Sequence, residues 1–132
     1  MAKSENALYR CDQIRVCEKQ AMAMYQLDEM ELMSQAGTEA FFFITRLYPD
    51  VKHVAVFCGA GNNAGDGYVF ARLAYEHGLS VIIYQCQALE NLPPAAKHFA
   101  SLALVAGVDC QSADETLDAD VELIVDTLLG IG

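Results

Sequence analysis

The sequence predicts an α/β fold in which helices cover both faces of a mainly parallel sheet. Two short apolar runs, HVAVFC at 53–58 and SVIIYQ at 80–85, have the length and β-branched content of buried strands. Each run is followed by a segment with helical periodicity, and strands that alternate with helices at this spacing form parallel sheets. A glycine-rich segment, Gly59–Gly67, joins the first strand to its helix.

Two helices are expected before the first strand. Asp12 is a suitable N-cap for the first helix, which runs to about Met24 with apolar residues on one face. The second helix runs from about Glu29 to Tyr48 and is ended by Pro49. The acids in its first turn suit the positive end of the helix dipole.

Glycine and proline mark the ends of the later helices. The helix after the glycine-rich segment extends to His77, and Gly78 is placed to cap its C-terminus. Pro93 and Pro94 begin a further helix, which Gly107 ends.

Two more strands are expected, a weak one near 108–110 and a final one over 123–128. Ligands of parallel α/β sheets bind at the carboxyl ends of the strands, where Gly59–Gly67 and Asp126–Gly132 would both lie. The chain stops just after its last strand, whereas doubly wound domains usually have more strands. We therefore expect residues 1–132 to be one domain, truncated at its C-terminal end.

Composition excludes several classes of protein. Eighteen acidic and eight basic residues give a formal net charge of −10, whereas a general nucleic-acid binder needs a basic face. The five cysteines are odd in number and form no CxxC pair, which is typical of reduced intracellular thiols and not of zinc ligands. The sequence shows no signal peptide, and its longest low-polarity stretch, 102–108, is too short to cross a bilayer. A cytoplasmic protein without membrane contact is expected.

The segment Gly59–Gly67 reads GAGNNAGDG, and its first six residues fit the dinucleotide fingerprint G-x-G-x-x-G/A. Small residues let the backbone approach a phosphate, and the helix N-terminus supplies N–H donors. An ordinary NAD-dependent dehydrogenase would also place an acid at the end of the second strand to bind the ribose. Gln85 occupies that position, which weakens this alternative.

Three polar residues of the segment, Asn62, Asn63 and Asp66, have no role in a plain phosphate loop. Their oxygens suit a hard cation or sugar hydroxyls. The alternative is that they only satisfy turn conformations and cap the helix, and for Asp66 capping explains the residue nearly as well. Three such residues among four glycines at a strand–helix junction favour a function.

The segment Gly59–Gly67, continuing into YVFAR, resembles the GxGNNGGDG(x)VxAR loop of the YjeF N-terminal domain family, the NAD(P)H-hydrate epimerases. Ala64 stands where that family usually has glycine. A second match is DTLLGIG at 126–132, similar to the family's D-A-L-F/L-G-T-G, with Ile131 in place of threonine and so without its hydroxyl. LMSQAG at 32–37 is similar to the family's L-M-E-x-A-G.

The resemblance implies a Rossmann-like three-layer sandwich, preceded by the two N-terminal helices, that binds hydrated NADH or NADPH. It implies an epimerase that interconverts the R and S forms of these damaged cofactors, of which a dehydratase partner, fused or separate, repairs one. By motif position the cofactor contacts are Asn62, Asn63, Ala64, Gly65 and Asp66, with Gly130, Ile131 and Gly132 beginning a second phosphate-binding loop. Asn63 and Asp126 would coordinate a potassium ion.

Asp126 is the expected acid/base. The nitrogen lone pair of the hydrated ring expels the added hydroxyl if an acid protonates it, and water then returns to either face. Partial burial at a strand end would help a carboxylate to exchange protons. The alternative is that Asp126 only caps the following turn.

Two further possibilities stay open. The chain could be a non-catalytic nucleotide-binding or scaffold module of the same fold, although the presence of both Asn63 and Asp126 favours the enzyme. Further ligands of the family lie beyond Gly132, so the chain alone is expected to hold only part of the site.

The run Phe41–Phe43 is expected in the helix core, but three adjacent aromatics cannot share one buried face. An outward member would offer an oligomer contact, such as that of a homodimer.

Overall fold

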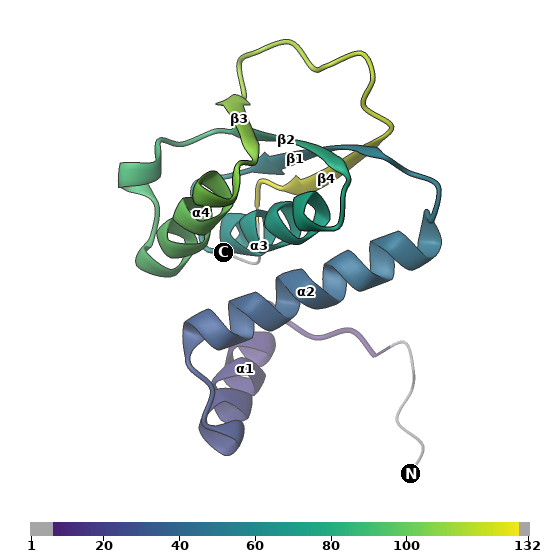
Figure 1. Cartoon of the computed structure of the whole chain (residues 1–132). Helices are drawn as coiled ribbons and strands as arrows, with labels where there is room; N and C mark the ends of the chain where they lie inside the picture. Colours follow the sequence, from purple (N-terminus) through teal and green to yellow (C-terminus); the bar gives the residue numbers. More distant parts are fainter. Residues whose placement is uncertain (1–6, 130–132) are drawn as a thin grey trace.

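The fold is a parallel α/β sheet preceded by two helices, and the computed structural model describes residues 7–129 of it (Figure 1). The elements, in chain order, are α1 (Cys11–Tyr25), α2 (Glu29–Leu47), β1 (His53–Cys58), α3 (Asn63–Glu76), β2 (Ser80–Gln85), the 3-10 helix η1 (Leu89–Asn91), α4 (Pro94–Ala106), β3 (Asp109–Ser112) and β4 (Leu123–Thr127). The four strands form one sheet in the order β3-β2-β1-β4, and every pair is parallel. The predicted parallel α/β fold is confirmed.

The order in which the chain adds strands to the sheet reverses between β1 and β4. From β1 the chain moves outward through β2 to β3, and it then returns to place β4 on the other side of β1. The last residues of β1 and β4, Cys58 and Thr127, are paired in register. A ligand crevice forms at such a switch point, outside the carboxyl ends of the strands.

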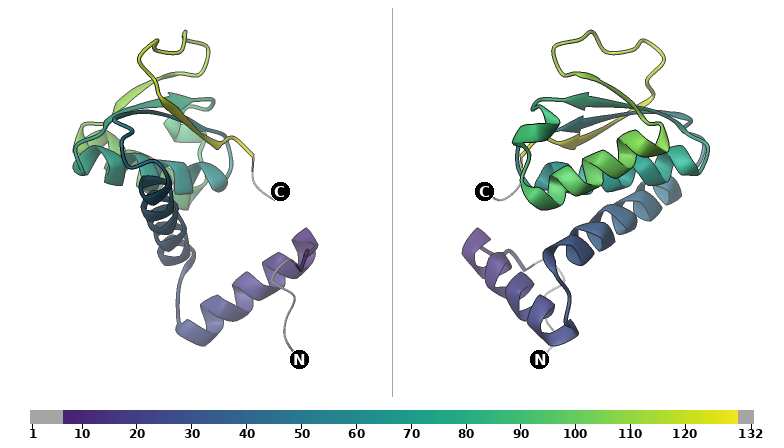
Figure 2. Two further views of the ribbon diagram at one scale, coloured as in Figure 1. Left: turned by 90° about the vertical axis from the view of Figure 1, so that its right-hand side faces the viewer. Right: turned by 60° about the vertical axis from the view of Figure 1, so that its left-hand side comes forward.

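Helix α3 is the centre of the packing. It lies against β1, β2 and β4, and both α2 and α4 pack against it. Figures 1 and 2 show these three helices on one face of the sheet. On that face the core includes Val54, Val56 and Cys58, because alternate residues of a strand point to the same side.

The opposite face carries no helix among residues 7–129, so the second helical layer of the expected sandwich is not found in the described part. The reason is the connection 113–122, which is a polar loop where a crossover helix would otherwise lie. Phe57 and Tyr84 stack on this face with ring centroids 4.9 Å apart. Tyr84 Oη also accepts a hydrogen bond from the backbone N–H of Asp118, which holds the loop to the sheet.

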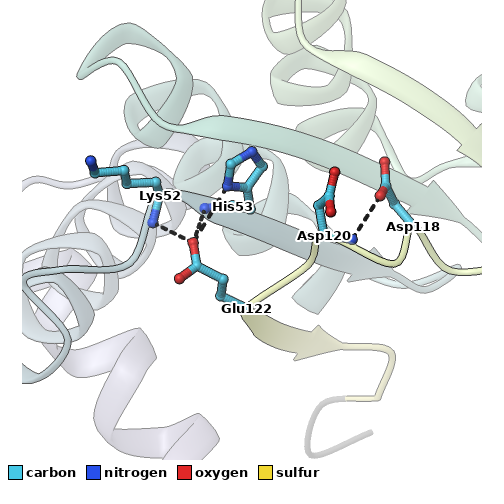
Figure 3. Close-up of polar contacts among 5 residues, drawn as sticks. All are labelled: Lys52, His53, Asp118, Asp120 and Glu122. Carbon is cyan, nitrogen blue, oxygen red and sulfur yellow. Dashed lines mark hydrogen bonds and ion pairs between the residues drawn. The ribbon is translucent and has the colours of Figure 1, made fainter.

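Glu122 fastens the far end of that loop (Figure 3). Its Oε1 accepts hydrogen bonds from the backbone N–H groups of Lys52 at 3.0 Å and His53 at 3.1 Å. His53 Nδ1 lies 3.4 Å from the same oxygen. These contacts join the start of β4 to the start of β1, and they lower the pKa of Glu122 below its ordinary value, mainly through the hydrogen bond from Lys52.

The prediction that Asp12 caps the first helix is wrong. The N-cap is Arg10, whose backbone N–H donates to Oε1 of Gln13 at 2.9 Å. Asp12 lies in the first turn and forms an ion pair with Arg10 instead. The predicted apolar face of α1 has no buried residue, because the helix projects away from the sheet (Figure 2).

The other predicted helix ends are largely confirmed. Asp28 caps α2 by accepting the N–H of Glu31 at 2.7 Å. Gly78 has a φ of +91° and donates to the carbonyl of Tyr75, while Leu79 donates to Ala74, which is the Schellman arrangement. The described helices include none with the length and hydropathy to span a bilayer.

The aromatic run of α2 divides as its spacing requires. Phe41 is buried against Phe70 of α3, whereas Phe42 and Phe43 are half exposed. The cysteines divide too: all five are free, but Cys58 is the only one of them that is buried. Burial raises the pKa of the Cys58 thiol to about 12, so it packs in the core as a neutral group.

Candidate functional site

A cavity of about 620 Å³ lies beside the N-terminus of α3. It is called the α3 cavity below. Its polar lining comes from three helices and the loop before α3: Glu18 of α1, Glu29 of α2, Asn62, and Asn63 and Asp66 of α3. Leu128 and Leu129, which follow β4, complete the wall nearest the sheet. Both segments predicted to carry the chemistry therefore contribute to one cavity.

Helix α3 begins at Asn63, inside the glycine-rich segment. The sequence predicted that the helix would begin only after this segment. Asn62 is the N-cap by position, but its side chain makes no capping bond. Its Nδ2 instead donates to Oε1 of Glu29 at 2.9 Å. The alternative that Asn62 only caps the helix is therefore wrong, and its amide ties α2 to the start of α3.

Asn63 links the two predicted motifs. Its Nδ2 donates a 2.9 Å hydrogen bond to the carbonyl oxygen of Leu129, which lies 66 residues away in the sequence. The amide oxygen of Asn63 has no hydrogen bond within the described chain, so it remains available to a ligand. The amide thus holds the segment after β4 against the glycine-rich segment.

Ala64 and Gly65 serve the packing of α3. Ala64 is buried, and a Cβ on Gly65 would collide with Sδ of Met33 in α2. Their N–H groups are bonded to the carbonyls of Gly61 and Asn62. These two residues would therefore contact a nucleotide through backbone N–H groups that already form hydrogen bonds in the first turn of α3.

Asp66 lies in the first turn of α3, half buried and in the wall of the α3 cavity. No capping hydrogen bond to its carboxylate is found in the described part of the chain, so the capping alternative lacks support. Burial, together with a smaller contribution from the nearby charge of Glu18, raises the pKa of Asp66 to about 6. The carboxyl therefore changes its protonation state close to neutral pH.

Asp126 differs from the expectation of partial burial. It is exposed, and its Oδ1 accepts the backbone N–H of Leu128 at 2.9 Å, so the predicted turn-capping contact is present. It pairs in register with Phe57 and so points to the sheet face opposite α3. The next residue, Thr127, is buried on the α3 side, where its Oγ1 donates to the carbonyl of Phe57. Asp126 does not line the α3 cavity.

The remaining predicted residues, Gly130, Ile131 and Gly132, lie outside the described residues. Among residues 7–129 no group of three histidine, cysteine, aspartate or glutamate side chains is arranged to hold a metal ion. Asn63 and Asp126 nevertheless suit a hard cation in chemistry, because each has one side-chain oxygen without a hydrogen bond in the described chain. Both side chains also form hydrogen bonds with the backbone of the 128–129 segment.

Sequence reasoning missed Glu18 and assigned Glu29 only to the helix dipole. Neither residue belongs to a motif of the sequence. Both acids reach the cavity only because α1 and the start of α2 lie over the N-terminus of α3. No spacing within α1 or α2 signals that arrangement.

Comparison with known proteins identifies the family. The model of the family described as YjeF-related protein N-terminus matches residues 29–132, which is more than half of the chain. The chain belongs to this family. The predicted resemblance is confirmed, and α1 lies before the matched region.

Curated relatives of this YjeF-related chain carry names from nicotinamide nucleotide repair. The bifunctional NAD(P)H-hydrate repair enzyme Nnr of Escherichia coli is 39% identical over 127 residues, which cover 96% of this chain and 25% of the relative. The NAD(P)H-hydrate epimerase of Rhodobacter capsulatus is 34% identical, over 92% of this chain and 60% of the relative. The chain thus spans from a quarter to three fifths of the length of these two relatives.

A solved structure shares the fold. The crystal structure of yeast ynu0, YNL200c, matches with a TM-score of 0.79 at 25% identity. The match covers 95% of this chain and 57% of the yeast chain. The arrangement of sheet and helices described above therefore occurs in an experimentally determined protein.

Proposed function

We propose that this chain takes part in epimerising hydrated NADH and NADPH, interconverting their R and S forms. The observation that carries the proposal is the α3 cavity at the β1–β4 switch point, where Asn63 binds the segment that follows β4. The names of the relatives supply the substrate class, since they are NAD(P)H-hydrate epimerases and repair enzymes.

The chemistry needs proton transfer at one oxygen. The ring nitrogen expels the hydroxyl from the neighbouring carbon when an acid protonates it, and water adds back to either face of the planar cation. The sequence suggests Asp126, at the end of β4, as one candidate for this acid/base; it is exposed and exchanges protons directly with water.

A bound potassium ion is part of the proposal. Asn63 and Asp126 would hold it through their free oxygens, and a cation at that point would neutralise negative charge on the nucleotide. The acidic residues of the cavity and the net charge of −10 make such neutralisation useful, because the described cavity wall contains no lysine or arginine.

An ordinary dehydrogenase agrees less well with the structure. At the end of β2 a dehydrogenase places an acid for the ribose hydroxyls. Gln85 stands there and donates from Nε2 to Oη of the buried Tyr68 at 3.1 Å. The side chain of Gln85 is thus bonded to the protein core, and it is not the acid that a dehydrogenase needs there.

Assembly and location are proposed in outline. The exposed rings of Phe42 and Phe43 on α2 suit a homodimer contact, and a dehydratase, fused or separate, would consume one epimer. The free cysteines suit a reducing cytoplasm.

The test is to incubate the chain with one purified epimer of hydrated NADPH and to separate the epimers by chromatography. We expect the other epimer to appear faster than in a sample without protein. Binding of the hydrate without any such acceleration would instead support the scaffold alternative.

A further inference from the structure

The acids of the glycine-rich and strand-end motifs, Asp66 and Asp126, lie in different surroundings. Asp66 is half buried in the wall of the α3 cavity, while Asp126 is exposed on the opposite side of the sheet and is bonded to Leu128. A molecule seated in the cavity would therefore meet Asp66. This separation was not expected from the sequence, which pointed to Asp126 as the acid/base.

The other charged groups around Asp66 are acidic. Glu18 of α1 and Glu29 of α2 are the remaining ionisable side chains in the described wall of the cavity, and Pro93 before α4 and the segment after β4 contribute only apolar residues there. Glu29 is already bonded to Asn62. Glu18 lines the same cavity and its negative charge acts on Asp66, and like charges in one cavity favour the protonated form of the more buried carboxyl.

We propose that Asp66 is the catalytic acid that protonates the leaving hydroxyl of the hydrated nicotinamide ring, and that Glu18, which also lines the α3 cavity, is a positioning residue that acts through Asp66. This inference rests on the proposed function, because it assigns a group to that reaction. It moves the proton donor from the exposed strand end into the α3 cavity.

The step balances in atoms and electrons. The carbon–oxygen bond breaks with its electron pair going to oxygen, the proton of the Asp66 carboxyl joins that oxygen, and water leaves. The nitrogen lone pair forms the carbon–nitrogen double bond of a cation. Water then attacks the other face of that carbon, and its proton returns to the Asp66 carboxylate directly or through solvent. Nothing is oxidised or reduced.

The protonation state of Asp66 makes the role possible at neutral pH. Its pKa is raised to about 6 by burial and by Glu18, so part of the population holds the proton where an ordinary aspartate would have lost it. A general acid works best when its pKa is close to the working pH. The dependence on Glu18 also gives α1 a part in the chemistry, although α1 precedes the region that the family model matches.

The test compares Asp66→Asn with Glu76→Gln on the whole chain. Glu76 is an exposed acid at the other end of the same helix, so its replacement is a matched control for lost charge. Asparagine keeps the size of Asp66 and cannot release a proton. We expect Asp66→Asn to slow epimerisation of one purified epimer by about 100-fold or more, within the usual contribution of general acid catalysis, and Glu76→Gln to leave it unchanged.

The pH profile separates catalysis from structure. With wild type we expect kcat/KM to fall as the pH rises through about 6, the pKa of Asp66. Glu18→Gln removes the charge that raises this pKa, so the fall should move to lower pH while the rate at acidic pH is kept. A role of Glu18 in packing alone would lower the rate at every pH without moving the profile.

Each result decides between the proposals. Active wild type with a slow Asp66→Asn variant and a shifted Glu18→Gln profile supports the inference. Active wild type with an unimpaired Asp66→Asn variant overturns it and leaves the proposed function standing. No acceleration by wild type overturns the proposed function and this assignment with it. Circular dichroism of each variant shows whether a loss of rate reflects a loss of fold.

Discussion

The side-chain amide of Asn63 donates a 2.9 Å hydrogen bond to the carbonyl oxygen of Leu129. The bond joins the start of α3 to the segment that leaves β4, and so it brings the two motifs of the sequence into one site. Replacing Asn63 by alanine leaves that carbonyl without its partner and frees the segment.

We expect Asn63→Ala to lower kcat/KM for epimerisation by about tenfold or more, because about 1.4 kcal/mol corresponds to a factor of ten. The free energy of unfolding should fall by only about 1 kcal/mol, the usual net worth of one hydrogen bond. Asn91→Ala, at an exposed asparagine of η1, is the control. Equal kinetics for the two variants would contradict the role of the amide.

Gly67 and Thr127 are in close contact between α3 and β4. A Cβ at Gly67 would occupy the place of Oγ1 of Thr127, which donates to the carbonyl of Phe57 at 2.7 Å. We expect Gly67→Ala to lower the free energy of unfolding by about 1–3 kcal/mol, as overpacking usually does. Gly61→Ala adds the same methyl group to open space and should change it much less. Urea unfolding of both variants measures the difference, and equal midpoints would show that the contact is not tight.

Asp66 should lower the stability of the protein at neutral pH. Its pKa is about 6 in the folded chain against an ordinary value of 3.8, so the folded state binds more protons than the unfolded state between these two pH values. By linkage, stability falls as the pH rises through this window, and the penalty is complete above about pH 6. We expect Asp66→Asn to be more stable than wild type at neutral pH by about 1 kcal/mol, a figure reduced because the carboxyl is partly exposed.

Unfolding measured across pH checks this prediction. The advantage of the variant should disappear below the ordinary pKa of an aspartate, where wild type is also protonated. A stabilisation that does not depend on pH would show that packing, not charge, is responsible. Together with the expected loss of activity, the pH-dependent gain would mark Asp66 as a residue kept for function at the expense of stability.

Glu122 should have the opposite pH dependence. Its carboxylate accepts the N–H groups of Lys52 and His53 (Figure 3), and its pKa is lowered, so its contribution is present above the unfolded pKa and is lost as the pH falls through the folded one. We expect Glu122→Gln to lower the melting temperature at neutral pH and to differ less from wild type in acid. Glu115→Gln, in the same loop but exposed and away from β1, is the control. A melting temperature for Glu122→Gln equal to that of the control would contradict the fastening role.

Local patterns predicted the central elements of the fold. The strands His53–Cys58 and Ser80–Gln85 agree with their predicted bounds, because each is a short apolar run between clear turn signals. Gly78 and Gly107 end their helices with positive φ, as only glycine does easily. The start of α3 was missed because its glycines read as a loop, whereas Gly65 and Gly67 are helical and make room for neighbouring elements.

The site was predicted in its motifs but not in its geometry. The sequence places Asn63, Asp66 and Asp126 at strand ends, but the face to which each points depends on register and on helix packing. Asp126 is exposed because its neighbour Thr127 takes the buried side of β4. Glu18 reaches the cavity through the placement of α1, which no local pattern records.

The central claim is that the chain accelerates epimerisation by loss and return of the hydroxyl group. One purified epimer of hydrated NADPH is incubated with the chain in water enriched in the heavy isotope oxygen-18. The epimers are then separated, and the mass of each is measured by mass spectrometry. The account predicts that the other epimer appears faster than without protein and carries one heavy oxygen atom. No acceleration, or an accelerated product without the heavy atom, would contradict it.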